Sequence, residues 1–165
     1  MTMEAVVAIN HADFRSVLGH FASGVVVITA SLDGYPVGFT CQSFFSLSLD
    51  PPLVALAPGR SSTSWPMIAA SQRLCVNVLA ADQEALARVF AVSGADKFAG
   101  VSWSPAPTPG GGPRLHQALA WIDCVVEEIH ETGDHFLVVA AVLDLEAGQG
   151  SPLLFYRGGF GSLSI

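Results

Sequence analysis

Positive charge is what this sequence has least of. Its 165 residues include seven Lys and Arg against 14 Asp and Glu, which gives a formal net charge of −7, and Lys97 is the single lysine. Proteins that bind nucleic acid normally carry net positive charge, so this class is excluded. An anionic ligand would have to be bound by these few cations, by backbone N–H groups or by helix ends.

Cysteine is also sparse, and its spacing excludes two common uses. Cys41, Cys75 and Cys124 are odd in number and far apart, with neither a CxxC pair nor a Cys/His metal spacing. This arrangement argues against a disulfide framework and against a zinc site. We expect buried, reduced thiols, which are typical of a cytoplasmic protein.

Long apolar runs are missing as well. No uninterrupted stretch approaches the roughly 20 residues that a membrane-spanning helix requires. The first residues, 1–10, lack the basic start and apolar core of a signal peptide. We therefore expect neither export nor a membrane partner.

Common catalytic and nucleotide-binding motifs are absent too. There is no GxGxxG after a predicted strand, no GxxxxGK[ST], no HExxH and no GxSxG. No two carboxylates stand out as an acid–base couple. These absences argue against a dinucleotide-binding βαβ unit, a P-loop, a zinc protease and an α/β-hydrolase, and no metal site is expected.

Apolar side chains, in contrast, are abundant. They make up 51% of the residues, while only 13% are charged, which excludes a disordered chain. A length of 165 residues suits one domain, residues 1–165, with a sizeable core. So much apolar surface is unusual for an isolated monomer, and a subunit interface is the usual place for it.

Turn signals between short apolar segments predict the order of the elements. Asp33-Gly34 is a strong hairpin signal, Pro51-Pro52 interrupts the pattern, and residues 102–113, rich in proline and glycine, predict an irregular surface loop. Asp13 and Asp82 are expected to cap helices. Helices are expected over 14–21, 65–70 and 82–90, and strands over 25–30, 35–45, 53–57, 74–79, 119–129, 136–145 and 153–156.

The balance of these elements predicts a mainly β fold. Strands outnumber helices, and short turns join most neighbours, which favours an antiparallel sheet closed into a barrel with two or three small helices outside. A doubly wound sheet would need regular alternation of strands and helices, which the sequence lacks.

Two polar clusters are candidate binding sites. Residues 60–64, Arg-Ser-Ser-Thr-Ser, directly precede a predicted helix, where hydroxyls, N–H groups and one guanidinium suit an anion. The alternative for this cluster is an ordinary serine-rich cap. In residues 38–44, small and hydroxyl side chains stand where a strand prefers bulky ones, which would let a flat ligand approach the backbone. The alternative here is a mere sheet edge.

One histidine stands in a suggestive place. His135 follows Gly133-Asp134 in a predicted hairpin turn, although a lone histidine in a turn is usually a solvated surface residue. No partner spacing assigns a role to the remaining four, which are His11, His20, His116 and His130.

Several short motifs follow one another in a fixed order along the chain. They occupy residues 14–25, 33–40, 43–54, 76–79 with Gln83, 96–98, 133–135 and 152–159. In this order they resemble the flavin reductase-like family, whose members supply reduced flavin to two-component monooxygenases. The resemblance covers residues 14–160, and residues 41–44 and 155–158 look most like reductase components of aromatic-ring and steroid-ring hydroxylases.

The resemblance implies an FMN-binding split β-barrel, antiparallel and Greek-key-like, that forms a homodimer with flavin at the subunit interface. It implies that His135 is the catalytic residue, facing the nicotinamide together with residues 156–159. It also implies a set of cofactor-binding residues, namely Val37, Gly38, Phe39, Thr40, Cys41, Gln42, Ser43, Pro58, Arg60, Ser61, Ser62, Ser64, Asn77, Gln83, Lys97, Phe98, Tyr156, Arg157, Gly158 and Gly159.

The function implied is an NAD(P)H:flavin oxidoreductase. NADH or NADPH would reduce FMN or FAD, and the reduced flavin would pass to a partner monooxygenase. Hydride transfer needs no obligatory acid or base, which agrees with the missing acid–base couple. A non-enzymatic flavin-storage protein on the same barrel is the alternative. A pyridoxine-phosphate oxidase is a third reading, but it should need more cations than this chain has.

Overall fold

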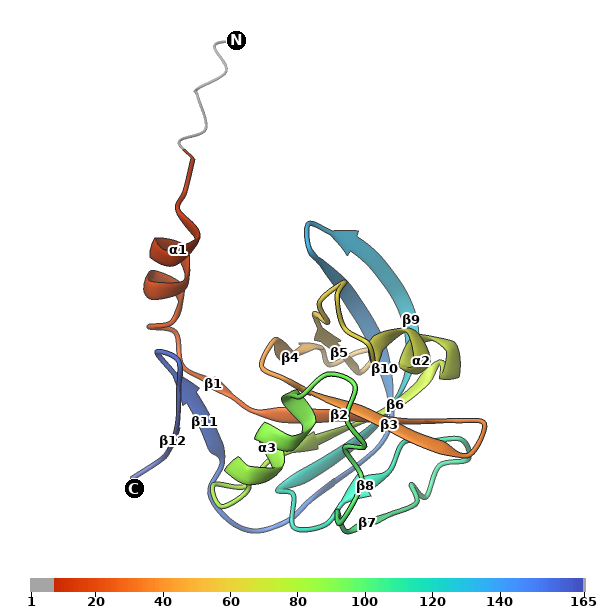
Figure 1. Ribbon diagram of the computed structural model, residues 1–165. Coiled ribbons are helices and arrows are strands. Elements are labelled where there is room, and N and C mark those ends of the chain that lie inside the picture. Colours follow the sequence, from red (N-terminus) through yellow and green to blue (C-terminus); the bar gives the residue numbers. More distant parts are fainter. Residues whose placement is uncertain (1–7, 165) are drawn as a thin grey trace.

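The computed structural model describes residues 8–164, and its centre is one antiparallel sheet of seven strands. The strands lie in the order β3-β2-β6-β9-β10-β5-β4, so segments distant in the sequence become neighbours (Figure 1). Their bounds are β2 Val26–Leu32, β3 Tyr35–Cys41, β4 Phe44–Ser48, β5 Leu53–Leu56, β6 Arg73–Val78, β9 Ala120–Thr132 and β10 His135–Ala147. The expected antiparallel, mainly β fold is confirmed.

Two tight hairpins follow from the turn residues. Asp33 and Gly34 have φ values of 51° and 81°, the left-handed conformation that a two-residue turn between β2 and β3 requires. The predicted turn after β9 is shorter than residues 130–135, because Thr132 already pairs with His135. Only Gly133 and Asp134 lie between these two paired residues. β9 and β10 therefore form one long hairpin that rises beyond the sheet (Figure 1).

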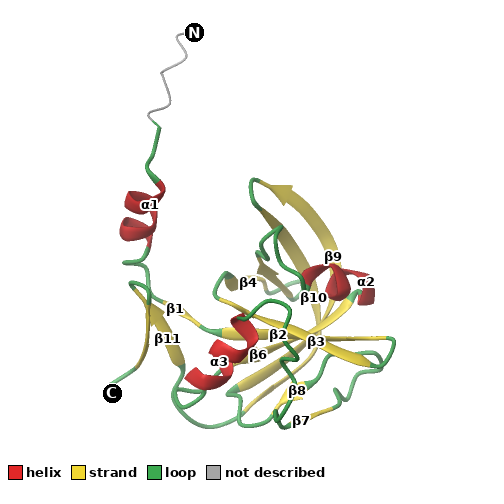
Figure 2. Ribbon diagram, viewed as in Figure 1, coloured by secondary structure: helices red, strands yellow, loops and turns green. Residues whose placement is uncertain are grey.

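Three short helices accompany the sheet, and Figure 2 shows them in red. α2 (Trp65–Ser71) packs on β2, β3 and β6, and α3 (Glu84–Ala91) packs on β3 and β2. α1 (His11–Leu18) buries none of its residues and projects from the body of the molecule. In the part of the chain that the structure describes, no helix is long and apolar enough to cross a membrane.

Two predicted helix caps are wrong. The N-cap of α1 is Asn10, whose Oδ1 accepts a hydrogen bond of 2.7 Å from the backbone N–H of Ala12, and Asp13 lies within the helix. The N-cap of α3 is Gln83 rather than Asp82. Its side chain makes no capping bond, because its Oε1 accepts from the backbone N–H of Ala80 instead.

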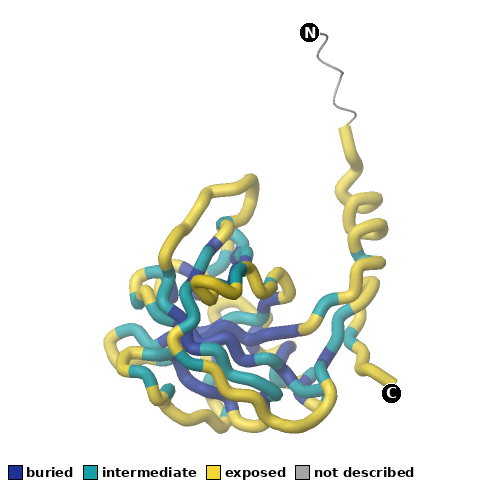
Figure 3. Tube along the Cα trace, turned by 180° about the vertical axis from the view of Figure 1, so that it is seen from behind, coloured by how far each residue is buried: buried dark blue, intermediate teal, exposed yellow. Residues whose placement is uncertain are grey.

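The core lies on both faces of β2. Val26, Ile28 and Ala30 belong to a cluster that extends to α2 and to β10, while Val27 and the preceding Val25 belong to a second cluster under α3. Figure 3 shows this strand region as the most deeply buried part of the chain. Since one strand serves both clusters, we propose that the chain folds as a single domain.

A small second sheet lies at the end of the molecule that carries α1. It has the order β1-β11-β12, with β1 at Ser23–Gly24, β11 at Leu153–Tyr156 and β12 at Gly159–Ser162. The strand over 153–156 is confirmed, and β12 was not predicted. The expected single strand over 35–45 is instead β3 and β4, separated at Gln42 and Ser43.

The proline- and glycine-rich segment is less irregular than expected. Within it, β7 (Trp103–Ser104) pairs with β8 (Arg114–Leu115), and Thr29 Oγ1 donates to the Pro113 carbonyl at 2.6 Å. The guanidinium of Arg114 contacts three carboxylates, at 2.7 Å from Asp123 and Asp144 and 2.9 Å from Glu146. These bonds fix the segment against the sheet.

Candidate functional site

The break between β3 and β4 forms one wall of a cavity of about 340 Å³. The wall consists of residues 39–43, and the opposite side is formed by Ala57, Pro58, Gly59 and His135. Ser43 fixes the break, because its Oγ donates to the Ala57 carbonyl at 2.9 Å. A cavity of this size, open to solvent and edged by backbone, hydroxyl and amide groups, suits a flat polar ligand.

His135 stands at this cavity with one ring nitrogen already bonded. Its Nδ1 lies 2.7 Å from Oδ1 of Asp134, and this hydrogen bond, together with the histidine charge, lowers the pKa of Asp134. An ionised carboxylate can only accept, so Nδ1 carries the proton, and Nε2 is left on the side of Gly59. His135 therefore presents Nε2 to a ligand in the cavity.

Arg60 joins the serine-rich loop to the long hairpin. Its backbone N–H donates to the Asp134 carbonyl at 2.9 Å, and Phe136 N–H donates to the Pro58 carbonyl at 2.9 Å. The guanidinium lies 5.6 Å from the ring centre of Phe136, and its NH1 is 3.6 Å from Oε2 of Glu131. The fold thus brings the candidate cluster at residues 60–64 next to the hairpin turn that carries His135.

The serines of this loop make different contacts. Ser62 Oγ accepts from the N–H of Trp65, the first residue of α2, at 3.1 Å, and the N-cap of this helix is Ser64, so part of the serine-rich cluster serves the start of the helix, as the alternative reading expected. Ser61 Oγ lies beside Gly59, within 3.9 Å of the position where a side chain would begin. Ser64 is buried and faces Lys97 in a second cavity.

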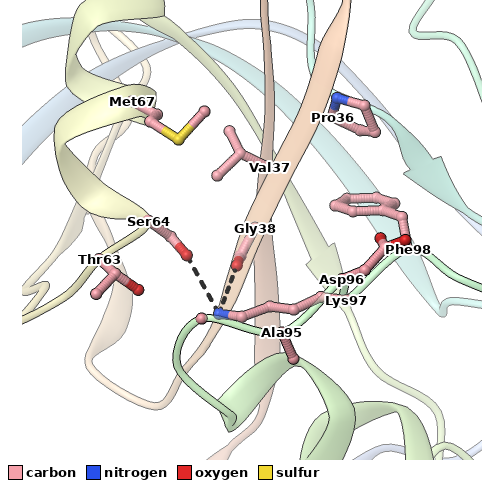
Figure 4. A pocket seen from close by; sticks show the side chains of 11 residues that line it. Pro36, Val37, Gly38, Thr63, Ser64, Met67, Ala95, Asp96, Lys97 and Phe98 are labelled. Carbon is pink, nitrogen blue, oxygen red and sulfur yellow. Dashed lines mark hydrogen bonds between the residues drawn. The ribbon is translucent and has the colours of Figure 1, made fainter.

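Figure 4 shows the residues that line this second cavity, which has a volume of about 290 Å³. Val37, Gly38 and Phe98 line it, and Lys97 crosses it. The ammonium of Lys97 donates to the Gly38 carbonyl at 3.0 Å, the Phe90 carbonyl at 3.1 Å and Ser64 Oγ at 3.2 Å. Burial lowers the pKa of Lys97. Because protein oxygens take all three of these bonds, Lys97 fixes β3 to α2 and α3.

Two predicted flavin contacts lie away from both cavities. Asn77 is fully buried, and its amide bonds to Val27, to Thr29 and to the N–H of Leu115 at 2.8–3.0 Å. Gln83 bonds Ala80 N–H and the His116 carbonyl, each at 2.9 Å. The side-chain oxygen and nitrogen of each residue bond within the protein, which supports a structural role, and flavin binding by these two residues stays a prediction.

The predicted nicotinamide face is divided. His135 lies at the long hairpin, whereas Tyr156, Arg157, Gly158 and Gly159 form the turn between β11 and β12, at a separate place in Figure 1. Arg157 N–H donates to the Gly19 carbonyl at 2.9 Å, which ties this turn to the base of α1. Within one chain, these two segments do not form a common site.

Three site residues were missed from the sequence. Ala57 and Gly59 line the first cavity, and Glu131 reaches Arg60. Ala57 and Gly59 carry no functional group that a motif could reveal, and their role comes from their backbone. Glu131 becomes visible only once the pairing of β9 with β10 places it beside the turn.

Cys41, at the edge of the first cavity, is held as a neutral thiol. It is 5% exposed, and burial raises its pKa, although the nearby Ser43 acts in the opposite direction. A neutral thiol is a weak nucleophile. Cys41 therefore contributes shape rather than reactivity to the cavity wall.

Comparison with known proteins identifies this arrangement. The model of the flavin reductase like domain matches residues 18–164. The chain belongs to this family. The reductase subunit HsaB of a flavin-dependent monooxygenase from Mycobacterium tuberculosis is 48% identical over 155 residues, which cover 92% of this chain and 82% of that protein. The resemblance found in the sequence is confirmed.

Solved structures of flavin reductases agree with the fold. Component B of nitrilotriacetate monooxygenase from Mycobacterium thermoresistibile superposes with a TM-score of 0.88, at 46% identity, over 93% of this chain and 86% of that one. The NADH:FAD oxidoreductase SgcE6 of Streptomyces globisporus also gives a TM-score of 0.88, at 31% identity, over all of both chains. The split β-barrel expected of this family is therefore the fold of the chain.

The residues of the first cavity fit a flavin. The backbone of residues 39–43 and Gly59 leaves room beside it for a flat ring. A Cβ atom at Gly59 would lie 3.7 Å from Nε2 of His135 and so occupy part of the space between them. Gln42 and Ser43 supply exposed polar groups, and Arg60 supplies positive charge nearby. Backbone, hydroxyl and guanidinium donors are the groups that bind the ring edge and phosphate of such a cofactor.

Proposed function

We propose that the chain carries out the reaction of its family, hydride transfer from a reduced nicotinamide to flavin, in the cavity between residues 39–43 and His135. The observation that carries this proposal is the meeting of three separate segments at one cavity: the end of β3, the loop at Pro58–Arg60 and the β9–β10 turn. When bound, a flavin supplies the ring that accepts the hydride, and the protein supplies its position.

Each segment has its own part in this proposal. Residues Phe39–Ser43 hold the ring edge through the backbone at the end of β3, and Arg60 with Ser61 binds phosphate. His135, through Nε2, orients the nicotinamide or places positive charge near the reduced ring. Because hydride transfer needs orientation and exclusion of water more than proton transfer, no further acid or base is required.

We propose NADH as the reductant and either FAD or FMN as the acceptor. The relatives support this choice, since one is named an NADH:FAD oxidoreductase and another an NADH-dependent FMN reductase. The scarcity of cations supports it as well, because NADPH carries an additional phosphate that the seven Lys and Arg would have to bind.

We infer that two copies associate through the outer face of β4, β5 and β10. Phe45, Ala55 and Val139 are directly paired across these strands and so share one face. On this face Phe45 is 51% exposed and Val139 is half-buried, whereas Ala55, at 1%, is already covered within the chain. Leu137 and Leu143 continue the apolar surface along β10. An apolar sheet face of this kind is unusual on a monomer.

The dimer would also complete the site. The first cavity opens beside this face, since Ala57 follows β5 and His135 begins β10. We propose that residues 156–159 of one copy approach the cavity of the other. These residues would then lie near His135 of the other copy, and the two segments expected to face the nicotinamide would form one site.

We propose that the reduced flavin is released to a monooxygenase. The name of the relative in Mycobacterium tuberculosis places that protein as the reductase subunit of such an enzyme. Release requires moderate affinity, and the open, solvent-accessible cavity agrees with a ligand that enters and leaves.

Anaerobic stopped-flow spectroscopy tests the reaction directly. The protein should reduce FMN or FAD with NADH in multiple turnovers, and more slowly with NADPH. The storage alternative predicts the opposite pattern, in which flavin stays bound through dialysis and free flavin is not reduced.

A further inference from the structure

The guanidinium of Arg60 already has a negatively charged neighbour. Its NH1 lies 3.6 Å from Oε2 of Glu131 and 3.5 Å from the Gly133 carbonyl. Both side chains of the ion pair are accessible, at 47% exposed for Arg60 and 71% for Glu131. The pair therefore lies where a ligand and solvent can reach it.

The charge distribution makes this contact significant. Arg60 is the cation that joins the loop to the hairpin beside the first cavity, in a chain with a net charge of −7. Two other carboxylates of the hairpin are paired with histidines, Glu128 with His130 and Asp134 with His135, each at 2.7 Å. The Glu131 carboxylate, in contrast, lies beside the Arg60 guanidinium.

We propose that Glu131 determines the affinity of this site for the phosphate of its ligand, by competing with that phosphate for Arg60. A phosphate that approaches NH1 of the guanidinium meets a carboxylate 3.6 Å from that nitrogen, so the two anions compete for the same part of the positive charge. The competition lowers the affinity for phosphorylated ligands and leaves the binding of the uncharged ring unchanged. This inference rests on the proposed role of Arg60, and it assigns a role to a residue outside the flavin-binding segments.

The size of the effect follows from the exposure of the pair. Exposed ion pairs of this kind contribute little, because water and salt screen them. Glu131→Gln should therefore tighten FMN binding by about two- to fivefold at low ionic strength. The gain should shrink as salt is added.

The experiment compares ligands with and without phosphate. The full chain and its E131Q variant are titrated with FMN and with riboflavin, and steady-state KM is measured for NADH and for a phosphate-free N-alkyl dihydronicotinamide. Tighter FMN with unchanged riboflavin identifies the flavin phosphate as the competitor. A lower KM for NADH with an unchanged KM for the analogue identifies the dinucleotide phosphates, and equal behaviour of the paired ligands in both arms overturns the proposal.

Two controls separate this competition from general repulsion. Glu128→Gln removes the same charge from the same hairpin, but from a residue paired with His130, so it should not reproduce the effect. In the double variant with Arg60→Ala, the E131Q gain should disappear. Equal gains from E128Q and E131Q would overturn the proposal, whereas reduction of riboflavin by NADH in these two single variants would leave the proposed function intact.

Discussion

At the scale of single residues, His135 shows how one hydrogen bond can set the role of a side chain. Asp134 binds Nδ1, so the ring cannot turn freely, and Nε2 is directed to the cavity. Replacing the ring should disturb the nicotinamide more than the flavin, which has the β3 backbone to bind it.

We expect His135→Ala to raise the KM for NADH about tenfold and to lower kcat modestly, while flavin affinity stays nearly unchanged. Steady-state kinetics and a separate flavin titration measure the two effects. His130→Ala is the matched control, because His130 lies on the same hairpin but pairs with Glu128. If His135→Ala leaves the KM for NADH unchanged, His135 is only a solvated turn residue.

For Asn77 we expect a substitution to change the stability of the protein and not its ligand binding. Its side chain joins β6 to β2 and to the loop before Leu115, with no exposed surface. Asn77→Ala would leave buried polar groups without partners, so it should lower the free energy of unfolding by about 3 kcal/mol. Urea denaturation measures this loss.

Flavin affinity, in contrast to stability, should not change when Asn77 is replaced. Under conditions where Asn77→Ala is folded, its flavin dissociation constant should equal that of the unaltered protein. Thr29→Ser, which keeps the hydroxyl of the same network, should be close to neutral in both measurements. A loss of flavin affinity at full stability would restore Asn77 to the site.

The predicted site residues differ in where the structure places their polar atoms. Residues 39–43 could be found because small polar side chains on a strand are unusual and signal a close approach. Asn77 and Gln83 occur in equally regular motifs, yet their polar atoms bond within the core. A sequence motif does not distinguish a polar group that faces a ligand from one that faces its own backbone.

At the scale of secondary-structure elements, the ammonium of Lys97 connects three segments of the fold through hydrogen bonds. It connects Gly38 of β3, Ser64 before α2 and Phe90 of α3. Lys97→Met keeps the length of the side chain but leaves these oxygens without their donor, which should lower the free energy of unfolding by about 1–3 kcal/mol.

Chemical denaturation again provides the measurement for Lys97→Met. Glu84→Gln is the control, because its ion pair with Arg88 is exposed and should contribute less than about 1 kcal/mol. An unchanged stability of Lys97→Met would show that the desolvation of the ammonium cancels its hydrogen bonds.

Boundaries of elements were harder to predict than their existence. The hairpin at Asp33-Gly34 was predictable because the turn requires those residues. Asn10 and Asp13 are both good cap residues, and the helix begins after Asn10, whose side chain accepts from the Ala12 N–H. β12 is rich in glycine and serine, and only its pairing with β11 makes it a strand.

At the scale of the whole molecule, the outer face of β4, β5 and β10 predicts the assembly. Phe45→Arg should disrupt association, because it places charge in the middle of an apolar interface. Size-exclusion chromatography with light scattering should give a dimer for the unaltered protein and a monomer for this variant. Val89→Arg, on exposed α3 away from this face, should remain dimeric.

The continuity of β10 links assembly to turnover. Its first residue is His135 at the cavity, and a few residues later the same strand presents Val139 on the outer face. If copies separate at low concentration, each loses support for this strand and the segment that the partner brings. The rate of flavin reduction per chain should therefore fall when the enzyme is diluted below its dimer dissociation constant, and recover when it is concentrated again.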